Sequence, residues 1–346
     1  MRRIVFVLGV FLIPLNVWPV QPSEETQTIP LSEVSGAVNI GSDRVILIAD
    51  EGYQVEVVSN AEATFTAGDP GSFNSNMRPA ALGTKGGKDV LDDIEDVAWD
   101  NTRQAAFVIT SHSRSKKQDD VPDPKATKPA RHQLARLIVK AGSIESPHQE
   151  TDVLAGALKR FPFVSAAMKR PHQEGGNAGT FNIEGLAFDQ KSGALLIGLR
   201  SPTRLHNGKP CAVVLTLKNP HKLFDRPSAL PKFDPRPRYL NLGGLGIRGM
   251  TYDAKKKGCW IVAGRSADPD ISSGQMPSSL WFWDLTKPNK QPQEAKVDLF
   301  GLENLEGVCL LDRDGKHGLL LISDDGGENN GSRYLWITIP RLSRSN

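Results

Sequence analysis

Short hydrophobic runs separated by polar turns occur along most of the chain, and four of them share one pattern. They occupy residues 93–100, 182–189, 246–253 and 304–311. Each is followed by a polar turn and a second apolar run, at residues 106–109, 194–197, 260–263 and 319–322. Two apolar runs joined by a short polar turn predict a β-hairpin. The chain therefore repeats a hairpin unit.

A fifth, more degenerate copy begins at residues 34–38 and continues through 45–49. One hairpin cannot bury its own apolar face, whereas several arranged radially can. The repeat therefore predicts an all-β protein, a β-propeller of about five to six blades. The copies are spaced irregularly and more widely than the roughly 40–50 residues of common blade repeats, which indicates insertions. A β-sandwich or β-helix is the alternative, although irregular spacing argues against a β-helix.

Two insertions separate the first two of these four copies. Residues 115–131 are charged and contain prolines, which predicts a loop. Within residues 152–168, Leu154, Leu158 and Phe161 recur at helical spacing and predict a short amphipathic helix.

The N-terminus has the pattern of a secretory signal peptide. Arg2 and Arg3 precede the apolar residues 4–13, and Pro14 and Asn16 interrupt the run before it reaches the roughly 20 residues that span a bilayer. We therefore expect residues 1–22 to be a signal peptide and residues 23–346 to form one propeller domain. This predicts a protein exported to the periplasm or the extracellular space, with no stable membrane span after processing.

Charge and cysteine content narrow the class of partner. With 42 Lys and Arg against 39 Asp and Glu, the net charge is +3, so we expect no nucleic-acid partner. The three cysteines, Cys211, Cys259 and Cys309, occur singly within apolar runs. That placement favours small buried side chains over a disulfide or a zinc site.

Charged residues recur at the same corner of nearly every hairpin. The start of the first strand and the end of the second lie at one edge of an antiparallel pair. The first-strand starts carry Glu95, Glu184, Arg248 and Glu306, and the second-strand ends carry His112, Arg114, Arg200, Arg265 and Asp324. If the first strand of each repeat is innermost, these side chains converge at one mouth of the central channel.

Two interpretations of this convergence remain open. In the first, Glu95, Glu184, Glu306 and Asp324 bind a hard divalent cation, with Ca²⁺ as the expected ion. The side chains of His112, Arg114, Arg200, Arg248 and Arg265 then bind a small anionic ligand. In the second, carboxylates and arginines only neutralise one another.

Three functions follow from these patterns. The leading hypothesis is an exported propeller that binds a small anionic ligand and a divalent cation at its charged face. The enzymatic alternative is a metal-assisted phosphoester or ester hydrolase, with His112 as candidate general base and Glu184 as a residue needed for turnover. The third is a protein-interaction scaffold that uses residues 115–131 or the opposite face.

Three other motifs carry no chemistry. The G-x-G-x-x-G pattern at residues 244–249 precedes a strand instead of a helix, so the nucleotide-binding context is missing. Residues 111–113 lack the nucleophile elbow of a hydrolase. Residues 312–315 lack the terminal acidic ligand of an EF-hand and predict a tight hairpin turn.

Several of these blocks occur together in a known family. Asn-Ile-Glu-Gly-Leu-Ala at 182–187, Gly-Leu-Arg-Ser-Pro at 198–202, residues 242–249 and Ser-His-Ser-Arg at 111–114 resemble the signature of the bacterial domain-of-unknown-function family 3616. The resemblance covers residues 35–340 and implies a propeller-like fold without an established activity. More remotely, the Glu-Gly hairpins are similar to those of the esterase-like phytase family, which implies metal-assisted phosphoester hydrolysis as a candidate activity.

Overall fold

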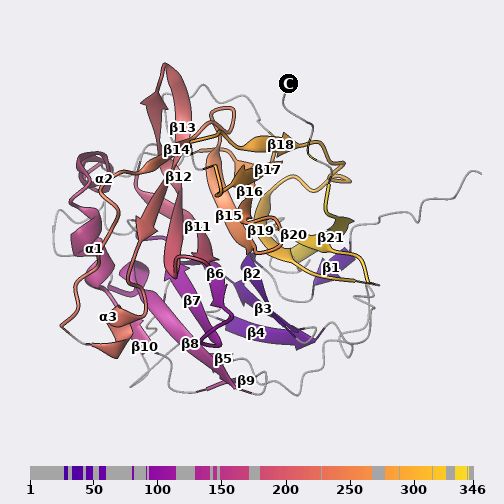
Figure 1. The fold of residues 1–346 in the computed structure, drawn as a ribbon, viewed down its shortest axis with the longest axis horizontal. Coiled ribbons are helices and arrows are strands. Elements are labelled where there is room, and N and C mark those ends of the chain that lie inside the picture. Colours follow the sequence, from indigo (N-terminus) through magenta and orange to yellow (C-terminus); the bar gives the residue numbers. More distant parts are fainter. Residues whose placement is uncertain are drawn as a thin grey trace, which may run out of the picture.

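In the computed structural model the described residues form five antiparallel sheets around a common axis (Figure 1). The structure describes residues 27–29, 33–41, 44–49, 54–59, 80–81, 91, 93–113, 129–140, 143–145, 149–170, 180–226, 228–266, 277–287, 289–313, 315–324, 332–340 and 342. The predicted signal peptide, most of the predicted loop 115–131, and Arg114 lie outside these residues.

Each sheet is a blade, and its strands are given from the axis outward. Blade 1 consists of β2 (Val34–Gly41), β3 (Arg44–Ala49), β4 (Gln54–Ser59) and β5 (Ala80–Ala81). Blade 2 consists of β6 (Ile94–Asp100), β7 (Ala105–Thr110), β8 (Leu134–Lys140) and β10 (Gln149–Thr151), with β9 (Ser143–Ile144) also paired to β8. Blade 3 consists of β11 (Asn182–Asp189), β12 (Ala194–His206), β13 (Lys209–Leu217) and β14 (Arg238–Leu240).

The last two blades follow the same plan. Blade 4 consists of β15 (Gly246–Asp253), β16 (Gly258–Gly264), β17 (Ser279–Asp284) and β18 (Gln293–Ala295). Blade 5 consists of β19 (Leu305–Leu310), β20 (Gly318–Ser323), β21 (Ser332–Thr338) and, from the other end of the chain, β1 (Gln27–Ile29).

The first strands of the five blades contact one another in a closed ring, in the order β2, β6, β11, β15, β19 and back to β2. These strands are the five repeat segments, so the predicted hairpins and their radial arrangement are confirmed. The antiparallel pairing of β1 with β21 completes blade 5 with the N-terminal end of the described chain.

The hydrophobic core lies between the blades. Five clusters of buried side chains each fill one interface between neighbouring blades. For example, Ala187 and Val214 of blade 3 pack with Ile261 and Trp283 of blade 4. All three cysteines are free and buried, as predicted.

The amphipathic segment at 152–168 is helical, but it forms two helices instead of one. They are α1 (Val153–Leu158) and α2 (Pro162–Met168). Pro162 has no backbone N–H and disfavours a helical Phe161, which is extended with φ −83° and ψ 114°.

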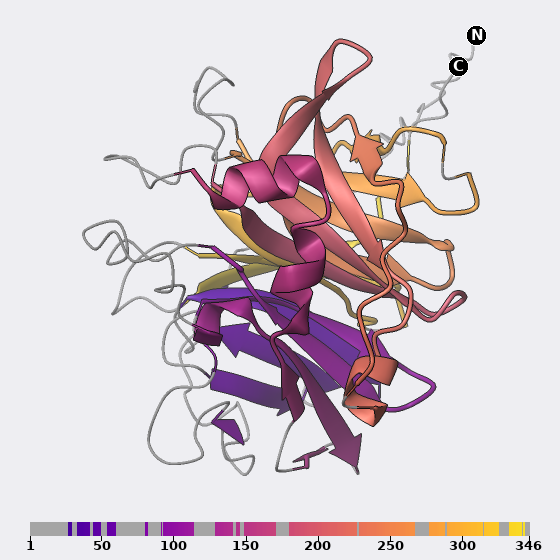
Figure 2. The ribbon, with the colours of Figure 1, turned by 90° about the vertical axis from the view of Figure 1, so that its left-hand side faces the viewer.

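The two helices cover the outside of the ring beside blades 2 and 3 (Figure 2). Among the described residues, the remaining short helices are η2 (Pro129–His132) and α3 (Lys222–Asp225). Within the described part of the chain, no helix has the length and apolar character needed to cross a bilayer.

Candidate functional site

Every innermost strand carries a bulge at the same repeat position. Pairing with the second strand shifts between Val34 and Gly36, Ile94 and Asp96, Ile183 and Gly185, Ile247 and Gly249, and Leu305 and Gly307. The residues at the bulges are Ser35, Glu95, Glu184, Arg248 and Glu306. A bulge changes the direction of a side chain. The fold therefore places four charged side chains at one end of the channel.

The three glutamates meet at this end, which we call the carboxylate mouth (Glu95, Glu184 and Glu306). One carboxylate oxygen from each lies within 4.8 Å of the others. Glu95 and Glu184 are buried, with 7% and 2% of their surface exposed. Carboxylates at this separation repel one another unless cationic groups offset them.

Two arginines supply part of that offset. Arg248 Nη1 lies 2.7 Å from Glu184 Oε2, and its Nη2 contacts Glu306 Oε1. Arg200 Nη1 lies 2.6 Å from Glu184 Oε1. Three carboxylates against two guanidinium groups leave one negative charge in this cluster. Arg200 and Arg248 thus direct their charge into the protein.

Two buried oxygens at this mouth have no hydrogen-bond donor among the described residues. They are Glu184 Oε2, whose contact with Arg248 lacks hydrogen-bond geometry, and Asn182 Oδ1. The amide of Asn182 donates to Glu184 Oε1 at 2.8 Å. Buried acceptors without donors are costly in a folded protein. The prediction from sequence did not include Asn182.

The two arginines respond differently to this environment. Burial and the nearby Arg200 lower the pKa of Arg248, although Glu184, Glu95 and Asp324 oppose the shift. Burial also acts to lower the pKa of Arg200, but Glu184, Glu95 and Asp93 outweigh it and raise that pKa. The surroundings therefore stabilise the charged form of Arg248 less than that of Arg200.

In four of the five blades a glycine follows the bulge, and at two of these glycines the backbone of the neighbouring inner strand lies close. A Cβ atom on Gly249 would lie 2.3 Å from the backbone oxygen of Glu306. Gly36, Gly185 and Gly307 occupy the same repeat position in blades 1, 3 and 5. A Cβ atom on Gly36 would likewise lie 2.9 Å from the backbone of Asp96, whereas one on Gly185 would meet the side chains of Ile247 and Met250.

Blade 2 departs from this pattern, because Asp96 stands where the other copies have glycine. Asp96 is fully buried and accepts backbone hydrogen bonds from Val97 at 2.8 Å, Leu186 at 2.6 Å and Met250 at 3.1 Å. Its side chain thus crosses the channel to blades 3 and 4. Burial raises the pKa of Asp96 well above its usual value, although these hydrogen bonds oppose the shift. The exception in the repeat alignment is the signal that would have identified this residue.

His112 is buried beyond the end of β7 in a left-handed conformation with φ 56°. Its Nδ1 lies 2.8 Å from the carbonyl oxygen of Thr110, so Nδ1 carries the proton and Nε2 holds the lone pair. Nε2 has no hydrogen-bond partner within the described chain. Burial lowers the pKa of His112 to about 3, so the ring is neutral near pH 7. It stacks on His132, the last residue of η2.

The serines beside His112 belong to a different network. Ser111 and Ser113 both donate their hydroxyl protons to Asp93, which also pairs with Arg131. The serines therefore point to a carboxylate and not to the imidazole, in agreement with the absence of a nucleophile elbow.

The remaining predicted residues lie at the edge of this mouth. Arg265 is exposed, and its carbonyl oxygen accepts a hydrogen bond from Arg200 Nε at 3.3 Å. Asp324 is half-buried and acts on the pKa of Arg248. The structure thus brings Glu95, Glu184, Arg200, Arg248 and Glu306 together, with Asp324 close by.

A family model described as "Protein of unknown function (DUF3616)" matches residues 33–333 of this chain. No curated protein matches it. Among solved structures, the allergen Mala s 1 of Malassezia sympodialis aligns with 10% identity over 90% of this chain and 95% of its own, at a TM-score of 0.46. The PQQ-bound aldose sugar dehydrogenase of Streptomyces coelicolor aligns with 12% identity over 91% and 96%, at 0.42. Likenesses of this size say nothing about function.

Proposed function

Since the chain belongs to the family of proteins of unknown function DUF3616, we propose its function from the geometry of the carboxylate mouth. The protein is an exported β-propeller that binds a divalent cation, Ca²⁺, between Glu95, Glu184 and Glu306. The bound cation then accepts a small anionic ligand. The similarity to the esterase-like phytase family stays a prediction.

The observation that carries this proposal is the meeting of three carboxylates with an unsatisfied oxygen. Ca²⁺ binds oxygen at about 2.3–2.6 Å, so two oxygens on one ion lie at most about 5 Å apart. The carboxylate oxygens here lie within 4.8 Å of one another. Glu184 Oε2 lacks a hydrogen-bond donor, and a cation between the three carboxylates would satisfy it.

Cation binding would also release an arginine. Arg248 contacts Glu184 and Glu306, so an ion between these carboxylates competes with its guanidinium group. A released Arg248 becomes available to an anion through paired N–H donors. Cation and anion binding are therefore coupled in this proposal, and each increases the affinity for the other.

Calorimetric titration of the purified protein with CaCl₂ tests the cation site. We expect saturable heat and a rise in melting temperature that EDTA reverses, and we expect E306Q and E95Q to lose both. E294Q is the matched control, because Glu294 lies on β18 and pairs with Lys296. An absence of heat, or equal binding by E306Q and E294Q, would contradict the proposal.

A hydrolase is the second candidate, favoured by the unpartnered Nε2 of His112. In that case the cation activates water or polarises the ester, and His112 accepts a proton. The test is turnover of p-nitrophenyl phosphate and p-nitrophenyl acetate with CaCl₂. We expect E184Q and H112N to lose activity while retaining the native circular dichroism spectrum. If the wild type hydrolyses both compounds only at the background rate, the result would contradict the hydrolase candidate.

Export rests on residues 1–22 and is tested separately. Expression of the full chain in a Gram-negative host, followed by N-terminal sequencing of the periplasmic protein, should give a start near residue 23. A protein that retains Met1 in the cytoplasm would contradict export.

The scaffold role stays a prediction. Among the described residues, the exposed large hydrophobic side chains are Leu205, Leu230 and Phe300, from three separate segments.

A further inference from the structure

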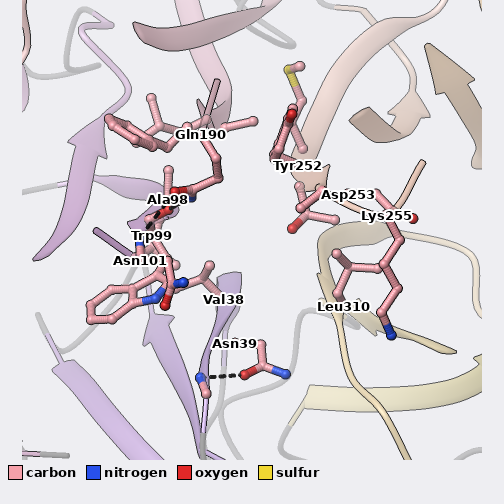
Figure 3. A pocket seen from close by; sticks show the side chains of 18 of the residues that line it. Val38, Asn39, Ala98, Trp99, Asn101, Gln190, Tyr252, Asp253, Lys255 and Leu310 are labelled. Atoms are coloured by element: carbon pink, nitrogen blue, oxygen red, sulfur yellow. Dashed lines mark hydrogen bonds between the residues drawn. The ribbon is translucent and has the colours of Figure 1, made fainter. Parts of the chain in front are cut away.

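The opposite mouth of the channel contains a pocket of about 430 Å³ (Figure 3). All five innermost strands begin at the carboxylate mouth, and the pocket is lined by residues from the far halves of these strands and the turns after them. Asp96 crosses the channel between the two ends. The pocket is therefore separate from the proposed cation site.

One repeat position supplies much of the pocket wall. Four residues after each bulge, the strands carry Asn39, Trp99, Phe188, Tyr252 and Leu310, and all five line the pocket. Figure 3 shows Trp99 and Tyr252 on opposite sides of the open space. Val97, Leu186 and Met250, two residues after their bulges, add an apolar surface. A concave apolar pocket with aromatic walls suits the ring of a small organic molecule.

The hairpin turns at this end of the channel are rich in basic residues. Every hairpin between a first and a second strand carries a basic residue: Arg44, Arg103, Lys191, Lys255 and Arg313. Lys256, Lys257 and Lys316 lie in the same turns. We call this end the basic mouth. Such a ring of positive charge attracts anions.

The aspartates at this end reduce the positive charge without cancelling it. Among the described residues, the eight basic side chains of these turns face four aspartates, Asp100, Asp189, Asp253 and Asp312, and the last two line the pocket themselves. Asp253 is buried and accepts hydrogen bonds from Trp260 Nε1 at 3.1 Å and from the backbone N–H of Lys256 at 2.9 Å. Asp189 and Asp100 likewise accept hydrogen bonds from the backbone N–H groups of Lys191 and Thr102.

Lys255 is the basic residue that lines the pocket directly. Its Nζ lies 3.1 Å from Asp312 Oδ2, and the side chains of both residues are more than half exposed. An exposed ion pair of this kind contributes little, so Lys255 can turn to a ligand at small cost. Asn39 and Asn101 line the same rim, and their side-chain amides offer further N–H donors.

We propose that the pocket at the basic mouth binds a small aromatic carboxylate. The ring packs against the wall formed by Trp99, Phe188 and Tyr252, and the carboxylate accepts hydrogen bonds from Lys255 and the rim amides. An organic cation is disfavoured by the excess of basic residues at this mouth, and an uncharged aromatic compound lacks the ionic attraction to Lys255.

Three probes of similar size distinguish these ligand classes: 4-hydroxybenzoate, benzyl alcohol and benzylamine. Calorimetry in low-salt buffer with EDTA should show 4-hydroxybenzoate binding at least tenfold more tightly than the other two. Its affinity should fall as salt is added, because salt screens the rim charges. Since EDTA removes any divalent cation, this result is independent of the proposed function.

Two variants place the binding at this pocket. K255Q should weaken 4-hydroxybenzoate at least fivefold, whereas K287Q, a matched change at the exposed Lys287 near the end of β17, should have no effect. L310W should fill the pocket and abolish binding, with the melting temperature as a check on folding. No binding of 4-hydroxybenzoate, equal affinity for all three probes, or equal affinities of K255Q and K287Q would overturn the proposal.

Discussion

Asp96 is an acidic residue placed where the repeat otherwise requires glycine, and its ionisation should oppose folding. The pKa of Asp96 is raised in the folded state. Its contribution to the unfolding free energy is therefore fully present below the unfolded pKa of about 4, and it is lost as pH rises toward the folded pKa. We therefore expect the unfolding free energy of the wild type, measured against D96N, to fall between pH 4 and pH 7. Urea unfolding of both proteins over this range measures the difference.

The same substitution at Asp234 provides a control of opposite sign. The backbone N–H of Arg236 and the side chain of Lys218 lower the pKa of Asp234. The unfolding free energy of the wild type, measured against D234N, should therefore rise with pH up to about pH 4 and stay constant above it. A difference between wild type and D96N that does not change with pH would show that ionised Asp96 is well accommodated by its three N–H donors.

His112 gives a second pH dependence, in the acid range. Its pKa is lowered to about 3 in the folded protein, so its contribution is present above about pH 6.5 and is lost as pH falls toward 3. The loss amounts to at most about 1.4 kcal/mol per pH unit. H112N should reduce this acid sensitivity, because asparagine tolerates the left-handed backbone and does not titrate. Urea unfolding at pH 4, 5 and 7 tests this, and equal acid sensitivity in both proteins would contradict it.

At the scale of elements, the bulge in each innermost strand directs the bulge side chain to one end of the channel. Hairpin repeats were predictable, because apolar runs and turns recur in phase. The convergence of Glu95, Glu184 and Glu306 was predictable from the same phase. Pairing of the arginines with these carboxylates was one of the two interpretations, but the particular partners of Arg248 were not predictable, because side-chain partners across blades depend on how the ring closes. Asn182 and Asp96 were also missed, because their roles depend on contacts between blades.

The close approach of strands at the bulges gives a prediction for Gly249. G249A places a Cβ atom 2.3 Å from the backbone oxygen of Glu306, so β15 and β19 must separate. We expect a loss of about 1–3 kcal/mol in unfolding free energy, as for an overpacked core, and weaker Ca²⁺ binding because Glu306 moves. Urea unfolding and calorimetry measure the two effects.

Gly156 in α1 is the control for this change. A Cβ atom there meets nothing within 4 Å, and alanine is the better helix former by about 0.5–1 kcal/mol. G156A should therefore leave stability unchanged or raise it. Equal stability of G249A and the wild type would mean that the inner strands separate without cost.

At the scale of the whole molecule, the two mouths of one channel differ in charge. The bulge residues gather carboxylates at one end, and the first hairpin turns gather lysines and arginines at the other. Both arise from one repeat, because five copies in register place equivalent positions at equal depth along the axis. The ring must close for either mouth to form.

Closure depends on β1, the N-terminal strand that completes blade 5. Its three residues pair with Ser332 to Tyr334 of β21, and Val34 N donates to Ser332 Oγ at 2.9 Å. Without β1, the edge of β21 has unpaired N–H and C=O groups that are open to another chain. A protein that begins at residue 31 should lose about 1–3 kcal/mol in unfolding free energy relative to one that begins at residue 23, because several backbone hydrogen bonds are removed. Urea unfolding and size-exclusion chromatography would compare the two proteins, and we expect the shorter one to associate. Equal midpoints and equal elution would show that four blades and an incomplete fifth suffice to hold the ring closed.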